Sequence, residues 1–556
     1  MGTRRSLSAL SSTRVIYSLI LLVISLLVAA AKPAHGASQP NILILIAEDL
    51  SPRVGAYGDS IARTPHIDAL AERSVRYTRA FTTAGVCAPS RAALMTGQHQ
   101  ISFGGQHMRT STSPLGPYLA QPDAEVRAFP EILRAQGYYT FTDRKLDYQF
   151  SGIRAGSGPF SLWNEENAGD RAWRHRAEGQ PFLGVINFFE THESGVMRQS
   201  GAPHSDSHQA SQVSRRPITA QRVAVTLPEQ VLLPPYLPDL PAVRRDLARH
   251  YDNIHLMDKR VGRILSALAS DGLIENTIIV WTTDHGDGLP RSKRELYDSG
   301  TRVPLLIAQP GQRAAVDDRL VSFVDLAPTV LAWAGIQPPT WLHGHPIGTT
   351  RRSYVYSSRD RIDEIMDRQR AIRSSRYRYI RSWHPNVPGG HALNYRDNLD
   401  MVRAWRDAYN AGALNHAQSQ WFEPVGREQL YDVMKDPHEL ENLIGDPAHA
   451  QVRGELSAAL DAFLARVGDT GTEPEALMRS RFLNDGQIPL TPAPYLENNA
   501  GAQRLLSPIG ASIGYQTTEN ERWRLYVDPL PKDLVITNIK SVRYGWRESP
   551  IVKISD

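Results

Sequence analysis

The sequence predicts an α/β fold in which a large mixed, mostly parallel central sheet is flanked by helices, with a smaller C-terminal α+β subdomain. Three almost uninterrupted apolar runs, at 41–47, 181–189 and 277–282, are typical of parallel strands that are buried on both faces. Residues 242–270 carry apolar side chains at helical spacing, which indicates a helix packed on the core. A chain of 556 residues is long enough for one large domain and a smaller one.

The composition is that of an ordinary globular chain, with 41% hydrophobic and 22% charged residues. The formal net charge of +4 resides in the first 36 residues, which contain Arg4, Arg5, Arg14 and Lys32 and no acid. The rest of the chain has no net charge, so its charge gives no indication of a polyanionic partner. We expect no nucleic-acid binding.

The N-terminus has the pattern of a secretory signal peptide, which we assign to residues 1–36. Arginines precede an apolar run from Val15 to Ala31, and the small residues around Ala34–Ala37 offer a cleavage region. An uncleaved anchor is the alternative, because the run is near the lower limit for a membrane span. No later stretch is long and apolar enough to cross a membrane. We expect a secreted or periplasmic protein that is free of the membrane after signal cleavage.

Acidic residues follow the first and the third of the predicted strands. Glu48 and Asp49 come directly after one, and Asp284 and His285 come after the other. Ligands bind at the carboxyl ends of strands in open α/β sheets, so these residues are candidate ligands for a cation. Carboxylates favour calcium or magnesium, whereas the imidazole widens the choice to manganese or zinc. Acids that only cap the turns after the strands are the alternative, which the recurrence of such groups disfavours.

Cys87 is the only cysteine, so it cannot form a disulfide within the chain. It opens the stretch Cys87-Ala88-Pro89-Ser90-Arg91, in which Pro89 fixes the backbone and the small residues that follow predict a helix. A helix N-terminus favours an anion, and the side chain of Arg91 can lie beneath the same spot. A buried thiol with no chemical role is the alternative.

With Thr96-Gly97, every fixed position of the pattern C-x-P-S-R-x-x-x-x-T-G is present. The chain here resembles the type I sulfatases of the alkaline-phosphatase-like superfamily, and the resemblance covers residues 40–450. It implies that Cys87 is converted to Cα-formylglycine by a formylglycine-generating enzyme, and that the hydrated aldehyde is the nucleophile. It also implies a divalent metal at the acids named above, with calcium the expected ion, although Glu48 stands where an aspartate is commoner.

The resemblance extends to groups around the sulfate. It implies that Arg91, Lys145 and Lys293 neutralise the sulfate and that His192 is a sulfate contact or proton donor. The ordinary pKa of a histidine, about 6.5, suits proton donation. For binding the sulfate, Arg294 is the alternative to Lys293.

Two further positions lie near the expected substrate. His107 belongs to a loop that the family places at the substrate mouth, so we expect it to contact the substrate; a surface histidine without such a role is the alternative. Asp147, two residues after Lys145, stands where many members of the family carry a histidine. A carboxylate would repel a sulfate unless it pairs with a cation, so the role of this residue is open.

We expect a catalytic domain at 38–350, a C-terminal subdomain at 351–470 and an extension of unknown role at 471–556. The expected function is hydrolysis of sulfate esters or N-sulfates on a sulfated carbohydrate, in a branch resembling N-sulfoglucosamine sulfohydrolases and polysaccharide sulfatases. One alternative is a phosphomonoester or phosphonate-ester hydrolase of the same superfamily. Another is a non-catalytic carbohydrate-binding protein, which is disfavoured because the nucleophile and metal groups are all present.

Overall fold

The computed structural model describes residues 39–143, 145–197, 209, 220–499 and 501–554. The described residues from Asn41 onward form one compact unit. The predicted signal peptide lies outside the described residues. Within the described part of the chain, no helix combines the length and the apolar character that a membrane span requires.

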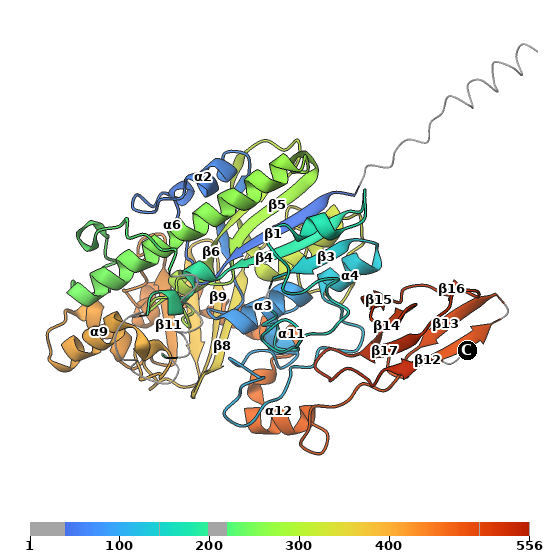
Figure 1. Cartoon of the computed structure of the whole chain (residues 1–556). Coiled ribbons are helices and arrows are strands. Elements are labelled where there is room, and N and C mark those ends of the chain that lie inside the picture. Colours follow the sequence, from blue (N-terminus) through green and yellow to red (C-terminus); the bar gives the residue numbers. More distant parts are fainter. Residues whose placement is uncertain (1–38, 144, 198–208, 210–219, 500, 555–556) are drawn as a thin grey trace, which may run out of the picture. The chain divides into compact units, whose positions relative to one another are not determined.

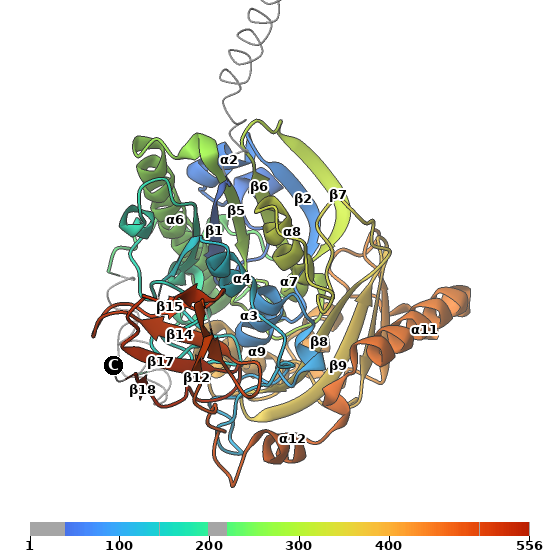
Figure 2. The same ribbon diagram turned by 90° about the vertical axis from the view of Figure 1, so that its right-hand side faces the viewer.

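Seven strands form the central sheet: β1 (Asn41–Ala47), β2 (Val75–Phe81), β3 (Tyr139–Thr142), β4 (Phe182–Phe188), β5 (Thr277–Thr283), β6 (Arg302–Ala308) and β7 (Ala315–Ser322). Their order is β3-β4-β1-β5-β6-β2-β7; β3, β4, β1, β5 and β6 are labelled in Figure 1, and β2 and β7 in Figure 2. Six strands run in one direction, and β6 is antiparallel to both of its neighbours. The prediction of a mixed, mostly parallel sheet is confirmed.

Helices cover both faces of this sheet (Figure 2). One face carries α2 (Pro65–Ala71) and α6 (Pro241–Ser270), and the other carries α3 (Cys87–Thr96), α4 (Phe129–Ala135) and α8 (Leu326–Trp333). Successive side chains of a strand point to opposite faces. In β1, Leu43 and Leu45 therefore pack in the core layer under α6, whereas Ile42 and Ile44 pack in the layer under α3 and α8. Burial on both faces explains why this strand shows no alternation of polar and apolar residues.

A second, four-stranded antiparallel sheet follows in the chain, in the order β11-β10-β9-β8. Its elements and the nearby helices are α7 (Asp298–Thr301), β8 (Val355–Ile362), β9 (Ile365–Arg373), β10 (Tyr377–Ser382), α9 (Asp400–Asn410), α10 (His416–Ser419), β11 (Glu428–Asp432) and α11 (Ala450–Val467). Ile372 and Tyr379 of this sheet pack against Leu460 and Phe463 of α11. The predicted C-terminal α+β arrangement is confirmed.

The last segment consists of α12 (Glu475–Phe482) and two small antiparallel sheets. One sheet contains β12 (Tyr495–Asn499), β13 (Ala502–Leu506) and β16 (Leu530–Pro531), and the other contains β14 (Ser512–Gln516), β15 (Arg524–Leu525), β17 (Asn538–Val542) and β18 (Val552–Lys553). Tyr544 stacks on Phe150 with ring centroids 4.6 Å apart and donates a hydrogen bond to Glu131 Oε2 at 2.6 Å. These contacts attach the segment to the α/β part of the protein.

Candidate active site

Neighbouring parallel strands bring acidic residues, among them the predicted Asp49 and Asp284, to one edge of the central sheet. β4, β1 and β5 lie side by side, and Glu193, Asp49 and Asp284 follow their carboxyl ends. The main-chain N–H of Asp49 donates to Asp284 Oδ1 at 3.0 Å, and that of Glu193 donates to Asp49 Oδ2 at 2.7 Å. The two acidic pairs predicted from distant parts of the sequence therefore form one cluster.

Cys87 is the first residue of α3, and it is buried against this cluster. Its Sγ lies 3.2 Å from His285 Nε2 and 3.8 Å from Asp49 Oδ1. Ser90 Oγ donates to the main-chain oxygen of Asp284 at 2.6 Å and so ties α3 to the end of β5. The N-terminus of α3, where unpaired N–H groups favour negative charge, lies at the acids.

The three cations expected around the sulfate are all present at this edge. Each donates to a different carboxylate: Lys145 Nζ to Glu48 Oε2 at 2.6 Å, Lys293 Nζ to Asp49 Oδ2 at 2.6 Å and Arg91 Nε to Asp284 Oδ2 at 3.0 Å. All of these side chains are buried. Alternating charges hold one another in place in a region from which water is largely excluded, where electrostatic interactions are strong.

The charges of the cluster shift the pKa values of its members. Burial alone would raise the pKa of Asp49, but the positive charges of Lys293, His192 and His285 outweigh burial and hold it well below its usual range. Burial would also raise the pKa of Asp284, but the positive charges of His285, Arg91 and Lys145 lower it to about 2. Burial would lower the pKa of His285, whereas the adjacent negative charges raise it to about 10. Both carboxylates are therefore ionised.

His192 lies half-buried beside Lys293, with 3.5 Å between His192 Nε2 and Lys293 Nζ. The main-chain N–H of Ser194 donates to His192 Nδ1 at 3.2 Å. Nδ1 also lies 2.8 Å from Ser194 Oγ, so the Ser194 contacts hold one side of the ring and Nε2 faces Lys293 and the acidic cluster.

His107, the expected substrate contact, and Arg294, the alternative to Lys293, are both buried in ion-pair networks. His107 is 2% exposed, and its Nδ1 accepts from the main-chain N–H of Arg361 at 3.2 Å and lies 3.8 Å from Glu475 Oε2. Burial lowers the pKa of His107 to about 4, so the ring is neutral. Arg294 donates to both carboxylate oxygens of Glu193, each at 2.8 Å. These contacts favour structural roles for both side chains.

Comparison with protein families decides what kind of enzyme carries this cluster. Residues 40–336, which include the nucleophile loop and the acids, match the family model described as Sulfatase. The chain belongs to the sulfatase family. Residues 291–386 also match the model described as N-sulphoglucosamine sulphohydrolase, C-terminal. The protein is therefore a sulfuric ester hydrolase.

Relatives of this sulfatase cover most of its length. It is 35% identical over 551 residues to an ulvan-active sulfatase of Formosa agariphila, covering 93% of this chain and 91% of that protein. It is 28% identical over 460 residues to the human N-sulphoglucosamine sulphohydrolase, covering 75% and 88% of the two chains.

Solved structures share its fold. A 2-O GAG sulfatase superposes with a TM-score of 0.57 at 23% identity, covering 78% of this chain and 94% of that chain. The phosphonate monoester hydrolase of Agrobacterium radiobacter superposes with a TM-score of 0.50 at 19% identity, covering 77% and 96%. The fold is thus that of the alkaline-phosphatase-like enzymes, as expected.

The acids of this sulfatase fit a divalent cation. Asp49, Asp284, His285 and Cys87 offer ligand atoms that all lie within 4.8 Å of one another. Glu48 Oε1 is buried, accepts no hydrogen bond from the described residues and lies 3.8 Å from Arg91 NH2, beyond hydrogen-bond distance. A buried carboxylate oxygen without a donor is costly unless a cation satisfies it. The donor set, mainly carboxylates with one imidazole, is compatible with the hard cation expected from the sequence.

Sequence reasoning missed Asn187, a second support of the nucleophile loop of this sulfatase. Arg91 donates to Asn187 Oδ1, and the Asn187 amide donates to Asp143 Oδ1 at 2.6 Å. The available signal was a polar residue within the otherwise apolar strand β4. Glu193, which binds both Lys293 and Arg294, was also missed, although it directly follows His192.

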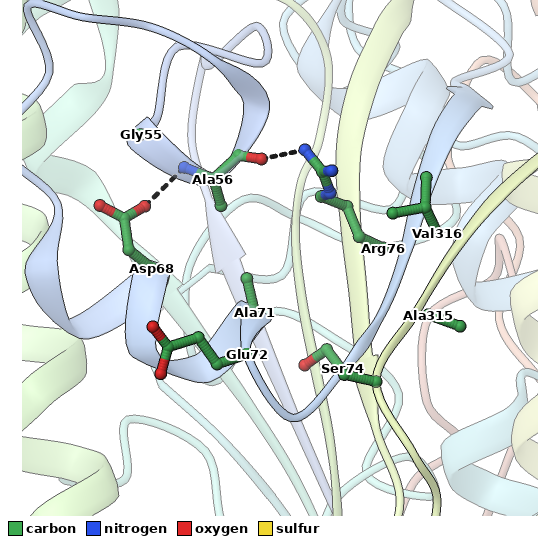
Figure 3. A pocket seen from close by; sticks show the side chains of 10 residues that line it. Gly55, Ala56, Asp68, Ala71, Glu72, Ser74, Arg76, Ala315 and Val316 are labelled. Carbon is green, nitrogen blue, oxygen red and sulfur yellow. Dashed lines mark hydrogen bonds between the residues drawn. The ribbon is translucent and has the colours of Figure 1, made fainter.

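A hollow of about 590 Å³ lies elsewhere on this sulfatase, by the first residues of β2 and β7 (Figure 3). Those residues are at the edge of the sheet opposite the acidic cluster, because β2 and β7 run in the same direction as β1. Its polar groups bind one another: the main-chain N–H of Ala56 donates to Asp68 Oδ1 at 2.6 Å, and Arg76 donates to Ala56 O. The hollow lies away from Cys87 and the acids, so we assign it no part in the reaction.

Proposed function

We propose that this protein is a secreted sulfatase that hydrolyses sulfate esters or N-sulfates of a sulfated carbohydrate. The observation that carries the proposal is the position of Cys87, whose Sγ lies within 3.8 Å of groups contributed by both acidic pairs. The names of relatives support a carbohydrate substrate, because one is an ulvan-active sulfatase and another an N-sulphoglucosamine sulphohydrolase. The apolar run at residues 15–31 supports export.

We further propose that Cys87 is converted to Cα-formylglycine by a formylglycine-generating enzyme, and that Glu48, Asp49, Asp284 and His285 hold Ca²⁺. When bound, the metal supplies positive charge that activates and orients a nucleophilic hydroxyl. The aldehyde supplies that hydroxyl through its hydrate, and an aldehyde can be re-formed when sulfate leaves. Carboxylates support calcium, and the single imidazole is the departure from an all-oxygen set.

The cations of the chain bind and orient the sulfate. Arg91, Lys145 and Lys293 each hold one carboxylate and have further N–H groups for sulfate oxygens. In a buried site such donors stabilise developing negative charge more strongly than water does. Because the carboxylates fix the positions of these cations, the cations need little reorganisation during the reaction.

His192 gives a proton to the leaving group in this proposal. Its Nε2 lies on the side of Lys293, and its Nδ1 is held by the N–H of Ser194. An ester oxygen or a sulfamate nitrogen leaves more readily when it is protonated.

The test is sulfate release by protein produced in a host that oxidises the cysteine, with the oxidation measured by peptide mass spectrometry. The substrates are ulvan oligosaccharides, glucosamine 2-N-sulfate and a 2-O-sulfated hexuronate, alongside matched aryl sulfate and aryl phosphate. We expect multiple turnovers on at least one sugar and faster cleavage of the aryl sulfate than of the aryl phosphate. A preference for the phosphate would overturn the proposal.

Cys87→Ser tests the role of the aldehyde, because a serine sulfate ester cannot expel sulfate by re-forming a carbonyl. We expect a trapped sulfated protein or no turnover. Undiminished multiple turnover by this variant would refute the role of the aldehyde.

A further inference from the structure

Asp147, which stands where many sulfatases carry a histidine, forms a bidentate ion pair with Arg109. Arg109 Nε donates to Asp147 Oδ1 at 2.8 Å, and Arg109 NH2 donates to Oδ2 at 2.6 Å. Asp147 is 2% exposed. The pair neutralises a carboxylate that would otherwise repel a sulfate.

The chain on either side places Arg109 at the rim of the active site. The preceding residue, Met108, packs against Cys87 and Ile362. Asp147 is two residues from Lys145, whose ammonium binds Glu48 in the cluster. The guanidinium is therefore held by the segment that carries one of the catalytic cations, Lys145.

The hairpin between β8 and β9 lies on the other side of the same loop. The main-chain N–H of Asp363 donates to Met108 O at 2.9 Å, and Asp363 Oδ2 lies 3.8 Å from Arg294 NH2. Arg109 is thus flanked by Asp147 on one side and by this hairpin on the other.

Arg109 differs from the catalytic cations in its exposure. Its side chain is 22% exposed, whereas those of Arg91, Lys145 and Lys293 are between 1% and 5% exposed. Nε and NH2 are used for Asp147, and no described residue accepts a hydrogen bond from NH1. One edge of the guanidinium is therefore available to a ligand that enters from solvent.

We propose that Arg109, held in place by Asp147, binds an anionic substituent of the substrate next to the sulfate that is hydrolysed. This inference rests on the proposed function, because it concerns the sugar that carries the sulfate. The hydrolysed sulfate belongs with the buried cations, whereas the exposed edge of Arg109 faces a group farther out. A planar guanidinium recognises paired oxygens, so the substituent is a carboxylate or a second sulfate.

The experiment measures binding in a Cys87→Ala background, in which no turnover occurs, by isothermal titration calorimetry. The ligands are glucosamine 2-N-sulfate, glucosamine 2-N,6-O-disulfate and an N-sulfated glucosamine linked to glucuronate. The first has one anionic group, and the other two add a sulfate and a carboxylate respectively. Comparing the second and third ligands identifies which kind of anion Arg109 takes.

We expect the parent protein to prefer at least one doubly anionic ligand over glucosamine 2-N-sulfate. Arg109→Gln combined with Asp147→Asn, which leaves no unpaired carboxylate to repel the sulfate, should weaken binding of that ligand by about 10- to 100-fold, the range for loss of a charge-assisted hydrogen-bonded pair. It should leave the singly sulfated ligand within about 2-fold. Arg352→Gln is the matched control. Arg352 also pairs with an aspartate, Asp325, through Nε at 2.7 Å, and its side chain is 15% exposed.

Asp147 is a positioning residue in this inference, so its variants test a coupling. Asp147→Asn should weaken binding of the doubly anionic ligand less than Arg109→Gln does. The double variant should bind no more weakly than Arg109→Gln alone, because the aspartate acts through the arginine.

The inference is overturned if the parent protein shows no preference for a doubly anionic ligand, or if the double variant keeps that preference. An equal loss for all three ligands in the double variant would also overturn it. If the binding pattern holds but the active enzyme releases sulfate from no sugar, the proposed function fails while the anion contact stands.

Discussion

Ser90 Oγ lies 2.6 Å from the main-chain oxygen of Asp284, although the two residues are 194 positions apart in the sequence. This hydrogen bond joins the first turn of α3 to the end of β5, so it fixes the distance between Cys87 and the acids. Ser90 of the signature therefore has a structural role that does not depend on its taking part in the reaction.

Ser90→Ala is expected to lower both stability and turnover. The change leaves a buried carbonyl oxygen without its donor, at a cost of about 1–3 kcal/mol in the free energy of unfolding. It also releases the helix that carries the nucleophile, so kcat should fall more than KM rises. Chemical denaturation and steady-state kinetics check this, with the formylglycine content of each preparation determined by peptide mass spectrometry. Equal kcat at equal formylglycine content would contradict the positional role.

Calcium is expected to raise the melting temperature of the protein through the acidic cluster. A ligand that binds only the folded state stabilises it by mass action. Chelation should abolish activity, and added Ca²⁺ should restore it. Asp49→Asn should remove most of the calcium-dependent shift in Tm, measured by differential scanning fluorimetry.

Glu48→Gln decides whether one acid or both of this pair bind the metal. If Glu48 Oε1 is a ligand, this variant also loses most of the calcium-dependent shift. A full shift in Glu48→Gln would restrict the role of Glu48 to pairing with Lys145. A full shift in Asp49→Asn would contradict the proposed metal site.

Glu475 of α12 is expected to stabilise the loop that carries His107. Its carboxylate accepts from Arg361 NH2 at 2.8 Å and from Tyr118 OH at 3.0 Å, and it is 3% exposed. Glu475→Gln leaves the buried guanidinium of Arg361 without its negative partner, which should cost about 3 kcal/mol in the free energy of unfolding.

Glu473→Gln is the control for this prediction. Glu473 pairs with Arg481 at 2.8 Å on the surface, with side chains 30% and 53% exposed. An exposed pair contributes little, so this variant should change stability by less than about 0.5 kcal/mol. Similar effects of the two substitutions would show that α12 is not needed by the loop.

His343 is expected to make the fold sensitive to mild acid. Its Nδ1 accepts from the main-chain N–H of His99 at 3.0 Å, and burial, followed by the charge of Arg466, lowers its pKa to about 4. In the unfolded chain the pKa is about 6.5. The unfolded state therefore binds a proton first as the pH falls, so the stability from this group is complete above about pH 6.5 and is lost towards pH 4.

The contribution of this histidine is about 1–3 kcal/mol. His343→Asn supplies an oxygen acceptor in place of Nδ1 but cannot titrate. We expect this variant to lose less in Tm than the parent between pH 7.5 and pH 5. Parallel losses in the two proteins would show that other groups control the acid sensitivity.

The sequence alone was enough to predict the central sheet, the family and the candidate nucleophile. The apolar run of β1 predicts a strand buried on both faces, because the apolar side chains on each face are stable only when they are removed from water. Leu43 and Ile44 do pack on opposite faces of the sheet. The acids at its end, and the signature around Cys87, are also local features. A local pattern therefore predicted the sheet, the family and the candidate nucleophile.

The tertiary structure decided how these groups pair, and it changed the interpretation of several residues. The sequence predicted a substrate contact at His107, whereas the structure buries this side chain beside Arg361 and Glu475, which come from distant parts of the chain. Arg109 received no role from its neighbours in sequence, yet it is the partner that makes Asp147 tolerable near a sulfate. The physical reason is that the energy of a charge depends on burial and on the few ångströms to its partner, and packing between distant segments sets both.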